Sequence, residues 1–214
     1  MVLGGNSVSI ISHIKVKMCW NAEVSRNTFL IGVVGIIIGI SYGMSLPVAF
    51  FCLSVSLMQL VEYFVWTYYD NKTVNYYASV AASNLLWIQP IASILTLTNS
   101  TYRNIALIVN TGLSGIGYFI ESEKDYSMTR ANNGHLSWNW MSTYNPITIV
   151  SLVVYMIFLF SPIIINKQYD LAALAGGTLV LSLYTYFREN TWGSMWCWIV
   201  NGLVLLTIGK TILH

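Results

Sequence analysis

Charged side chains are scarce in this sequence. Ten Lys or Arg and eight Asp or Glu make up only 8% of its 214 residues. Soluble domains carry about 25% charged residues, so this chain cannot build a water-facing surface from its own side chains. Hydrophobic residues account for 56% of the chain, and the mean hydropathy is +0.62. Lipid must therefore cover most of the outside, and membrane lipid is the first partner that we expect.

Other scarcities exclude further classes of protein. Three cysteines are too few for a disulfide framework and show no C-x-x-C spacing of a zinc site. The net charge of +2, with no basic run beyond residues 13–17, argues against nucleic acid as a partner. The sequence has three histidines and no Ser-His-Asp, H-E-x-x-H, serine-elbow or Gly-rich phosphate pattern. Whether the chain is an enzyme stays open.

Seven apolar segments are long enough, or nearly so, to cross a membrane. A helix needs about 20 residues to span roughly 30 Å of hydrocarbon. The segments are approximately 27–43, 46–68, 74–97, 102–120, 145–165, 169–187 and 194–212. We predict an all-α polytopic membrane protein with seven transmembrane helices over residues 27–214, after an N-terminal segment over 1–26. In the first helix, Gly32, Gly35 and Gly39 share one face, which favours close helix packing.

The distribution of Lys and Arg predicts the orientation of the chain. With seven spans, the N-terminus lies on the same side as the links after the second, fourth and sixth helices. That side carries seven basic residues and the other carries three, namely Lys15, Lys17, Arg26, Lys72, Lys124, Arg130 and Arg188 against Arg103, Lys167 and Lys210. Because inner links are enriched in Lys and Arg, we predict an inside N-terminus and an outside C-terminus.

Glu62 is the main polar anomaly inside a predicted span. It lies about 9 Å from the inner end of the second helix, at 1.5 Å per residue. A carboxylate at this depth costs several kcal/mol unless it is neutralised or paired, and such acids mark functional sites by default. Gln59, Tyr63 and Trp66 fall on the same helical face, which should point into the bundle. The alternative is a protonated Glu62 that only hydrogen-bonds to a neighbouring helix.

The third segment carries Gln89 next to Pro90. Because proline has no N–H, Pro90 frees the carbonyl of Leu86 and is expected to kink the helix. In lipid such a carbonyl needs another partner, so this turn should face protein or water. Gln89 is therefore a candidate ligand-binding residue.

A polar and aromatic stretch over residues 189–201 joins the last two segments. It contains three tryptophans together with Glu189 and Cys197. Tryptophan is enriched at the headgroup level, so the tryptophans are consistent with a helix anchor alone. A sharper interpretation places Glu189, Cys197 and Trp196 in a polar site assembled from several helices. The sequence leaves both interpretations open.

The link over residues 121–144 is the longest. It is too short for a soluble domain, and we expect a lid or an interfacial segment there. It contributes His135 and Trp138 to the candidate site. The complete set of predicted ligand-binding residues is Gln59, Glu62, Gln89, His135, Trp138, Glu189 and Trp196.

Five short pieces of the chain recur together in one known family. The pieces are Met18-Cys19-Trp20, Gln59 with Glu62, Ile88-Gln89-Pro90, Gly134-His135-Leu136-Ser137-Trp138, and Glu189 followed by Ser194-Met195-Trp196-Cys197. In order and spacing they resemble a family of small seven-helix membrane proteins from bacteria and large DNA viruses, most closely its viral branch. Family members usually begin at the Met-Cys-Trp, so residues 1–17 depart from the pattern. The resemblance implies a seven-helix fold and supplies no activity.

Five polar side chains fall toward the inner side of the membrane in the predicted topology, namely Cys19, Glu62, His135, Glu189 and Cys197. Thiolate, imidazole and carboxylate are all zinc ligands, so Cys19, His135 and Cys197 form a candidate metal site. A Cys19–Cys197 disulfide is an alternative if that side is oxidising. Simple buried packing of the cysteines is another. The sequence names no cofactor.

The function that these features favour is binding or transport of a small ligand through a polar site on the inner side of the helix bundle. The absence of an internal repeat counts against transport, because repeats are common in transporters. The alternatives are a structural protein of a viral internal membrane and a membrane-embedded enzyme, including a metal-dependent one. Association of the chain into a homo-oligomer is also left open.

Overall fold

Seven α-helices make up most of the computed structural model, which describes residues 21–120, 125–141 and 145–213. Within these residues each predicted apolar segment forms one helix, so the all-α class is confirmed. The helices are α1 (Ala22–Ser41), α2 (Leu46–Thr67), α3 (Lys72–Leu95), α4 (Ser100–Ile120), α5 (Pro146–Ile165), α6 (Tyr169–Tyr186) and α7 (Trp192–Leu213).

Asparagine is the N-cap residue of several of these helices. Asn21, Asn71 and Asn145 are N-caps whose side-chain oxygens accept hydrogen bonds from backbone N–H groups of the first turn. Asn99 accepts in the same way from Tyr102 N, at 3.1 Å. The cap at Asn21 explains why α1 begins at Ala22, before the predicted apolar segment. The remaining polar residues of its first turn are compatible with a helix that projects past the hydrocarbon.

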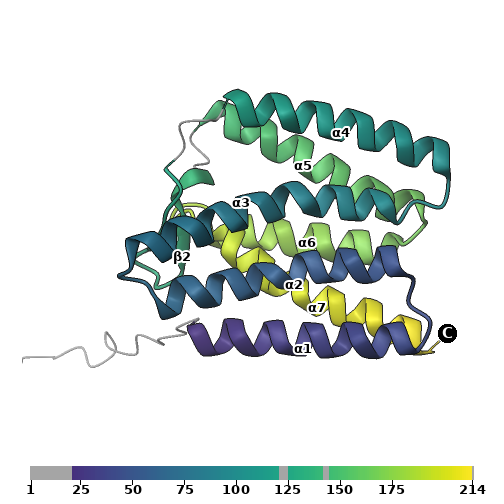
Figure 1. The fold of residues 1–214 in the computed structure, drawn as a ribbon, viewed down its shortest axis with the longest axis horizontal. Coiled ribbons are helices and arrows are strands. Elements are labelled where there is room, and N and C mark those ends of the chain that lie inside the picture. The colour runs from purple at the N-terminus through teal and green to yellow at the C-terminus, as the bar shows by residue number, and fades with distance from the viewer. Residues whose placement is uncertain (1–20, 121–124, 142–144, 214) are drawn as a thin grey trace, which may run out of the picture.

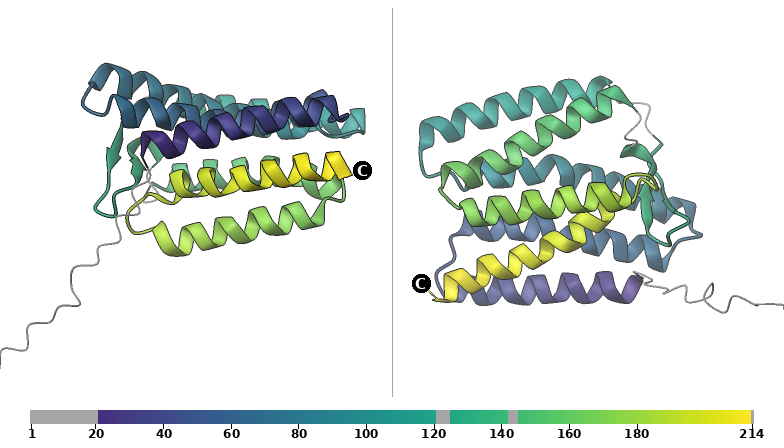
Figure 2. Two further views of the ribbon diagram at one scale, coloured as in Figure 1. Left: turned by 90° about the horizontal axis from the view of Figure 1, so that it is seen from below. Right: turned by 180° about the vertical axis from the view of Figure 1, so that it is seen from behind.

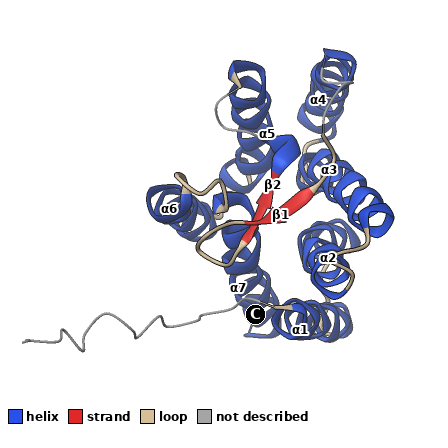
Figure 3. Ribbon diagram, turned by 90° about the vertical axis from the view of Figure 1, so that its left-hand side faces the viewer, coloured by secondary structure: helices blue, strands red, loops and turns tan. Residues whose placement is uncertain are grey.

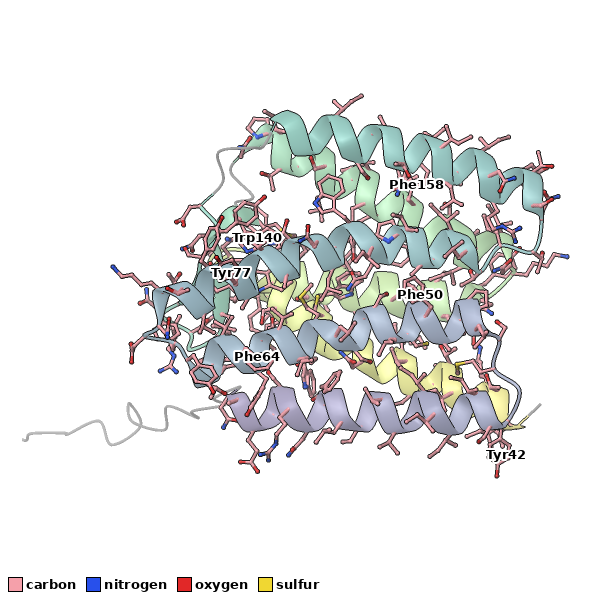
Figure 4. All side chains as sticks on the ribbon, in the orientation of Figure 1. Tyr42, Phe50, Phe64, Tyr77, Trp140 and Phe158 are labelled. Carbon is pink, nitrogen blue, oxygen red and sulfur yellow. The ribbon has the colours of Figure 1, made fainter. Side chains whose placement is uncertain are left out.

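The helices run alternately in opposite directions and define two ends of the bundle (Figure 1). The hairpin end contains the start of α1, the α2–α3 and α6–α7 turns, and residues 125–141. The distal end contains the α1–α2, α3–α4 and α5–α6 turns and the end of α7. In Figure 4, Tyr77 and Trp140 mark the hairpin end and Tyr42 marks the distal end.

An end-on view shows a ring of helices with one helix outside it (Figure 3). Neighbours that pack together around this ring are α1 with α2, α2 with α3, α3 with α5, α5 with α6, α6 with α7, and α7 with α1. Helix α7 also packs on α2, and α4 lies against α3 and α5. Figure 2 shows α6 and α4 at the periphery of the bundle. The interior is therefore bounded by α2, α3, α5, α6 and α7.

Five of the helices are long and apolar enough to span a membrane, namely α1, α2, α3, α5 and α7. Their outer faces expose large apolar side chains, such as Ile37 (62% exposed) and Val150 (63% exposed). Water would not stabilise such faces, whereas lipid does. Helix α6 is shorter, with 18 residues, and carries Asp170 in its first turn. By length and composition, these apolar helices are compatible with an integral membrane protein.

The predicted glycine face of α1 is a packing surface. A Cβ atom on Gly32 would lie 2.5 Å from the Ser56 hydroxyl oxygen on α2. A Cβ atom on Gly35 would lie 2.8 Å from a methyl group of Ile208 on α7. Both distances are too short for an unmoved neighbour, so a side chain at either position would require Ser56 or Ile208 to shift, and glycine allows the close approach of α1 to α2 and α7.

The described part of the longest link, residues 125–141, contains a small β-hairpin. Strands β1 (Met128–Arg130) and β2 (Leu136–Trp138) pair antiparallel, with Met128 opposite Trp138, and the short helical turn η2 (Asn139–Met141) follows. Gly134 closes the turn with φ +85°, a backbone conformation that favours glycine. All three residues of β2 are buried. The hairpin is thus inserted among the helix ends, as Figure 3 shows.

Candidate functional site

Glu62 lies inside the protein, as its helical face predicts. Its side chain is only 3% exposed, and it sits about 8 Å from the end of α2, five residues at 1.5 Å each. Gln59, one turn earlier, is completely buried and donates a hydrogen bond from Nε2 to Glu62 Oε2, at 3.2 Å. The prediction that Glu62 faces protein and not lipid is confirmed.

Two further elements meet at the Glu62 carboxyl group. The indole of Trp138 on β2 and the hydroxyl of Ser194 on α7 both face it. The second carboxyl oxygen, Oε1, makes no hydrogen bond with the described residues, and neither do Gln59 Oε1 and Trp138 Nε1. Buried polar atoms are paired in most proteins, so these three unpaired atoms in one place need an explanation.

The hairpin covers this cluster from the hairpin end. Trp138 and Trp140 stack with ring centroids 5.3 Å apart, next to the buried side chains of Met128 and Leu136. Gly193 on α7 accommodates the stack, because a Cβ atom there would lie 2.9 Å from the Trp138 ring. The cluster is therefore closed off by a packed aromatic layer.

Asparagine side chains hold the hairpin in place. Asn75 on α3 donates to Met128 O at 2.8 Å and accepts from Met128 N at 2.9 Å, as a neighbouring β-strand would. Asn190 in the α6–α7 turn donates to Trp138 O at 3.3 Å. Asn133 in the hairpin turn donates to the Thr191 hydroxyl at 2.8 Å. Sequence reasoning missed these residues, because a lone asparagine at a helix end carries no signal of a distant partner.

The first strand is also fixed at its outer edge. The phenol oxygen of Tyr69 accepts a hydrogen bond from Arg130 N at 2.9 Å. The guanidinium of Arg130 lies over the rings of Trp66 and Tyr69, 5.0 Å and 5.6 Å from their centroids. These cation–π contacts place a positive charge at the rim of the hairpin end.

Deeper in the bundle, a second set of polar groups follows the Glu62 cluster. The Cys197 thiol lies three residues after Ser194 on the same face of α7, and it lines a pocket together with Tyr155 on α5. The Tyr155 hydroxyl donates to Gln89 Oε1 at 2.5 Å, and Gln89 Nε2 donates to Ser54 O at 3.2 Å. Groups that exchange protons thus extend from Glu62 to the centre of the bundle.

These deeper groups line an internal pocket. It encloses about 890 Å³ of empty space, part of it open to the surroundings, between α2, α3, α5, α6 and α7. Its inner end is formed by Gln89, Tyr155 and Cys197. It also reaches Thr96 and Asn166, which cap the ends of α3 and α5 at the distal end. The pocket therefore extends from the middle of the bundle to the distal end.

The walls of the pocket are mainly apolar, and several of their polar groups donate hydrogen bonds within the protein. Ser93 and Thr207 donate to backbone carbonyls at 2.8 Å and 2.9 Å. Trp196 Nε1 donates to Ala175 O at 3.3 Å, and Asn166 Nδ2 donates to Thr96 O at 3.1 Å. A hydroxyl oxygen keeps an acceptor position after donating. The pocket consequently offers hydrogen-bond acceptors to a guest.

The predicted ligand-binding residues divide among four places. Gln59, Glu62 and Trp138 form the cluster beneath the hairpin, and Gln89 and Trp196 line the pocket. His135 is buried in the hairpin, with its ring edge-on to Tyr186 at 5.4 Å, and burial lowers its pKa because it disfavours the imidazolium form. Glu189 is exposed in the α6–α7 turn. The predicted residues therefore do not form one continuous site, although the predicted topology places several of them toward the same side of the membrane.

The predicted metal site is only partly within the described residues. Cys19 lies outside them, so its position relative to His135 and Cys197 is not described. Within the described part of the chain, no three His, Cys, Asp or Glu side chains come together as a set of metal ligands. Cys52 and Cys197 are buried free thiols. The disulfide and metal interpretations thus receive no support from His135, Glu62 and Cys197 alone.

Comparisons with protein-family models, curated protein sequences and solved structures found no match to this chain. The resemblance to the family of small seven-helix membrane proteins stays an expectation from sequence motifs. Three of those motifs meet in space, because Trp138 of the hairpin piece and Ser194 of the last piece both face Glu62 of the second piece.

Proposed function

We propose that this chain is a membrane protein that binds a small, mainly apolar molecule carrying one hydrogen-bond donor. The observation that carries the proposal is the pocket between α2, α3, α5, α6 and α7, with its apolar walls and its spare acceptors. The lining residues include no Asp, Glu, Lys or Arg. A neutral guest is therefore favoured over an ion, and an alcohol is the simplest matching chemistry.

The closed hairpin end argues for access from the distal end in this conformation. The pocket reaches the distal turns, whereas the aromatic layer of the hairpin covers the other end. Movement of the guest across the membrane would require the hairpin to leave its place. Transport would thus need two events, binding of the guest in the pocket and movement of the hairpin, and binding is the one proposed first.

The proposal includes seven membrane spans with the N-terminus inside. The arrangement of α4 and α6 supports seven spans. Both lie alongside the other helices, along the same axis, and each connects one end of the bundle to the other (Figure 1). Within the described residues, the basic side chains at the hairpin end are Arg26, Lys72, Arg130 and Arg188, against Arg103, Lys167 and Lys210 at the distal end. Cysteines introduced into 69–73 and into 99–101 should react with an impermeant thiol reagent from opposite sides. Reaction of both from one side would contradict the topology.

Native mass spectrometry of the purified full-length protein tests binding directly. The probe is 1-decanol, and decane, which has the same chain without the hydroxyl, is the control compound. We expect a one-to-one adduct with 1-decanol and a much weaker one with decane. Equal binding of the two compounds would remove the hydrogen-bond argument, and no adduct with either would contradict the proposed function.

A matched pair of variants on α7 assigns the adduct to the pocket. Leu203 lines the pocket, whereas Leu206 is 38% exposed on the outer face. Leu203→Trp should fill the pocket and abolish the 1-decanol adduct, and Leu206→Trp should leave it unchanged. If both variants bind 1-decanol equally well, the guest binds elsewhere.

A further inference from the structure

Among the residues that the structure describes, no charged side chain contacts the Glu62 carboxyl group. On its own helix it meets the amide of Gln59; from β2 it meets the Trp138 indole. From α7 it meets the Ser194 hydroxyl, and the Cys197 thiol lies three residues further along the same helix. Within the described residues the ion pair present joins Lys210 to Asp170, at the distal end. A carboxylate buried at 3% exposure without a cation is very costly, so the neutral acid is the stable form.

The hydrogen-bond pattern also calls for a proton. Gln59 Nε2 already donates to Glu62 Oε2, while Glu62 Oε1 and Gln59 Oε1 are both acceptors without a partner among the described residues. A proton on Glu62 Oε1 would convert this oxygen into a donor, and the carbonyl oxygen of Gln59, one turn away on the same helix, would be an acceptor for it. Acid and amide would then form a reciprocal pair with two hydrogen bonds, and both unpaired oxygens would be satisfied.

The protonated acid is connected to the pocket. Cys197 lies three residues after Ser194 on α7, on the same helical face as the hydroxyl that faces Glu62, and both Cys197 and Tyr155 line the pocket. Thiol, phenol and carboxylic acid all carry exchangeable protons. A change of charge at Glu62 therefore acts on groups that touch the guest.

We propose that Glu62 is a proton-binding site whose occupancy is coupled to the pocket. With the hairpin in place, Glu62 holds a proton on Oε1 and pairs with Gln59. When the O–H bond breaks and the proton passes to water, the carboxylate that remains needs solvation, which requires the hairpin to move away. The coupling to the guest rests on the proposed function, whereas the proton site does not.

The sign of the coupling follows from the closed structure. The pocket is formed in the structure in which the hairpin covers Glu62, and that arrangement requires the protonated acid. The guest should therefore bind the protonated state more tightly. Binding should then move the midpoint of Glu62 deprotonation to higher pH, and raising the pH should weaken binding by the same factor. We expect a shift of about one pH unit, which corresponds to about a tenfold change in affinity.

Infrared difference spectroscopy of the full-length protein in lipid nanodiscs tests the proton site. The C=O stretching band of a protonated carboxylic acid should be present at neutral pH and should disappear in Glu62→Gln. Glu189→Gln, which changes an exposed carboxyl at the same end, is the control and should keep the band. Absence of the band in the wild-type protein at neutral pH would overturn the proposal, as would its loss in the control alone.

Titration of the same band with 1-decanol and with decane tests the coupling. Cys197→Ser and Tyr155→Phe should reduce the decanol-induced shift. A shift with 1-decanol supports the coupling, and an unmoved midpoint with bound 1-decanol overturns it. The two proposals fail separately: a titrating band without any decanol adduct contradicts the proposed function alone, and an adduct without the band contradicts the proton site alone.

Discussion

The two ends of the bundle are closed in different ways. At the distal end the turns between helices have three or four residues and satisfy their own backbone groups, as Met44 N does with Gly39 O at 2.9 Å. At the hairpin end, a longer segment is inserted among the helices. Its backbone carbonyls accept hydrogen bonds from Asn75 and Asn190, and its Arg130 N–H donates to the Tyr69 hydroxyl oxygen, all of them distant in sequence.

The contrast shows what it takes to close a helix bundle in a membrane. Every buried backbone N–H and C=O needs a partner, and a short turn provides that partner locally. An inserted hairpin must take partners from other elements, so its position depends on a few side chains. We infer that the hairpin end is tight but sensitive to substitution, whereas the distal end is tolerant and leaves the pocket accessible.

The largest effect is expected at Glu62. Glu62→Gln keeps the size and the neutral hydrogen-bonding character of the protonated acid, so it should fold normally. Glu62→Lys places a cation among the same uncharged partners and should destabilise the protein by about 3 kcal/mol. Thermal melting in detergent compares the two variants. Equal melting temperatures would contradict the buried position of this side chain.

Removal of the Asn75 amide should have the next largest effect. Asn75→Ala leaves both the N–H and the C=O of Met128 without partners, at a cost of about 2–4 kcal/mol. Asn84, on the same helix but exposed, provides the control variant Asn84→Ala. Hydrogen exchange should become faster across residues 128–138 in the first variant only. Unchanged exchange in Asn75→Ala would show that the hairpin is held by other contacts.

A methyl group at Gly193 tests the aromatic layer. Gly193→Ala places a Cβ atom against the Trp138 ring and should cost about 1–3 kcal/mol through overpacking. Gly202→Ala is the matched control on α7, because no atom lies within 4 Å of a Cβ atom there. Melting temperatures that fall in neither variant would mean that Trp138 moves easily.

The pH dependence of the hairpin separates His135 from Glu62. The buried imidazole has a lowered pKa, so the unfolded chain binds its proton more readily and stability falls as pH drops below about 6.5. The Glu62 proton acts in the opposite direction, loosening the hairpin as pH rises. Hydrogen exchange at both extremes measures the two effects. His135→Gln should remove the acid effect alone, and an unchanged acid effect in this variant would assign it to another group.

The smallest effect is expected at the distal end. Lys210 on α7 pairs with Asp170 on α6, and both side chains are largely exposed. Exposed ion pairs contribute little, so Lys210→Met should leave the melting temperature nearly unchanged. A large loss of stability would show that the distal end is held by its polar contacts too, and the contrast between the ends would be lost.

The helices could be predicted because their lengths are set by the bilayer and their ends by asparagine caps and polar turns. The burial of Glu62 and the packing of Gly32 followed from helical spacing. The hairpin could not be predicted, because strands of three residues show no periodicity and their main partner, Asn75, is 53 residues away. The pocket was missed for a similar reason: Tyr155 and Thr207 are ordinary residues of apolar helices, and only packing brings them together.

Sided thiol labelling tests the central claim, that the bundle is closed at the hairpin end and open to the pocket at the distal end. The native cysteines are replaced by alanine, and Thr207→Cys or Ser194→Cys is introduced into that background. Thr207 lines the pocket, and Ser194 lies beneath the hairpin beside Glu62. We expect Thr207→Cys to react with an impermeant reagent added from the distal side only, and Ser194→Cys to react from neither side. Reaction of Ser194→Cys from the hairpin side, with Thr207→Cys protected, would contradict the account.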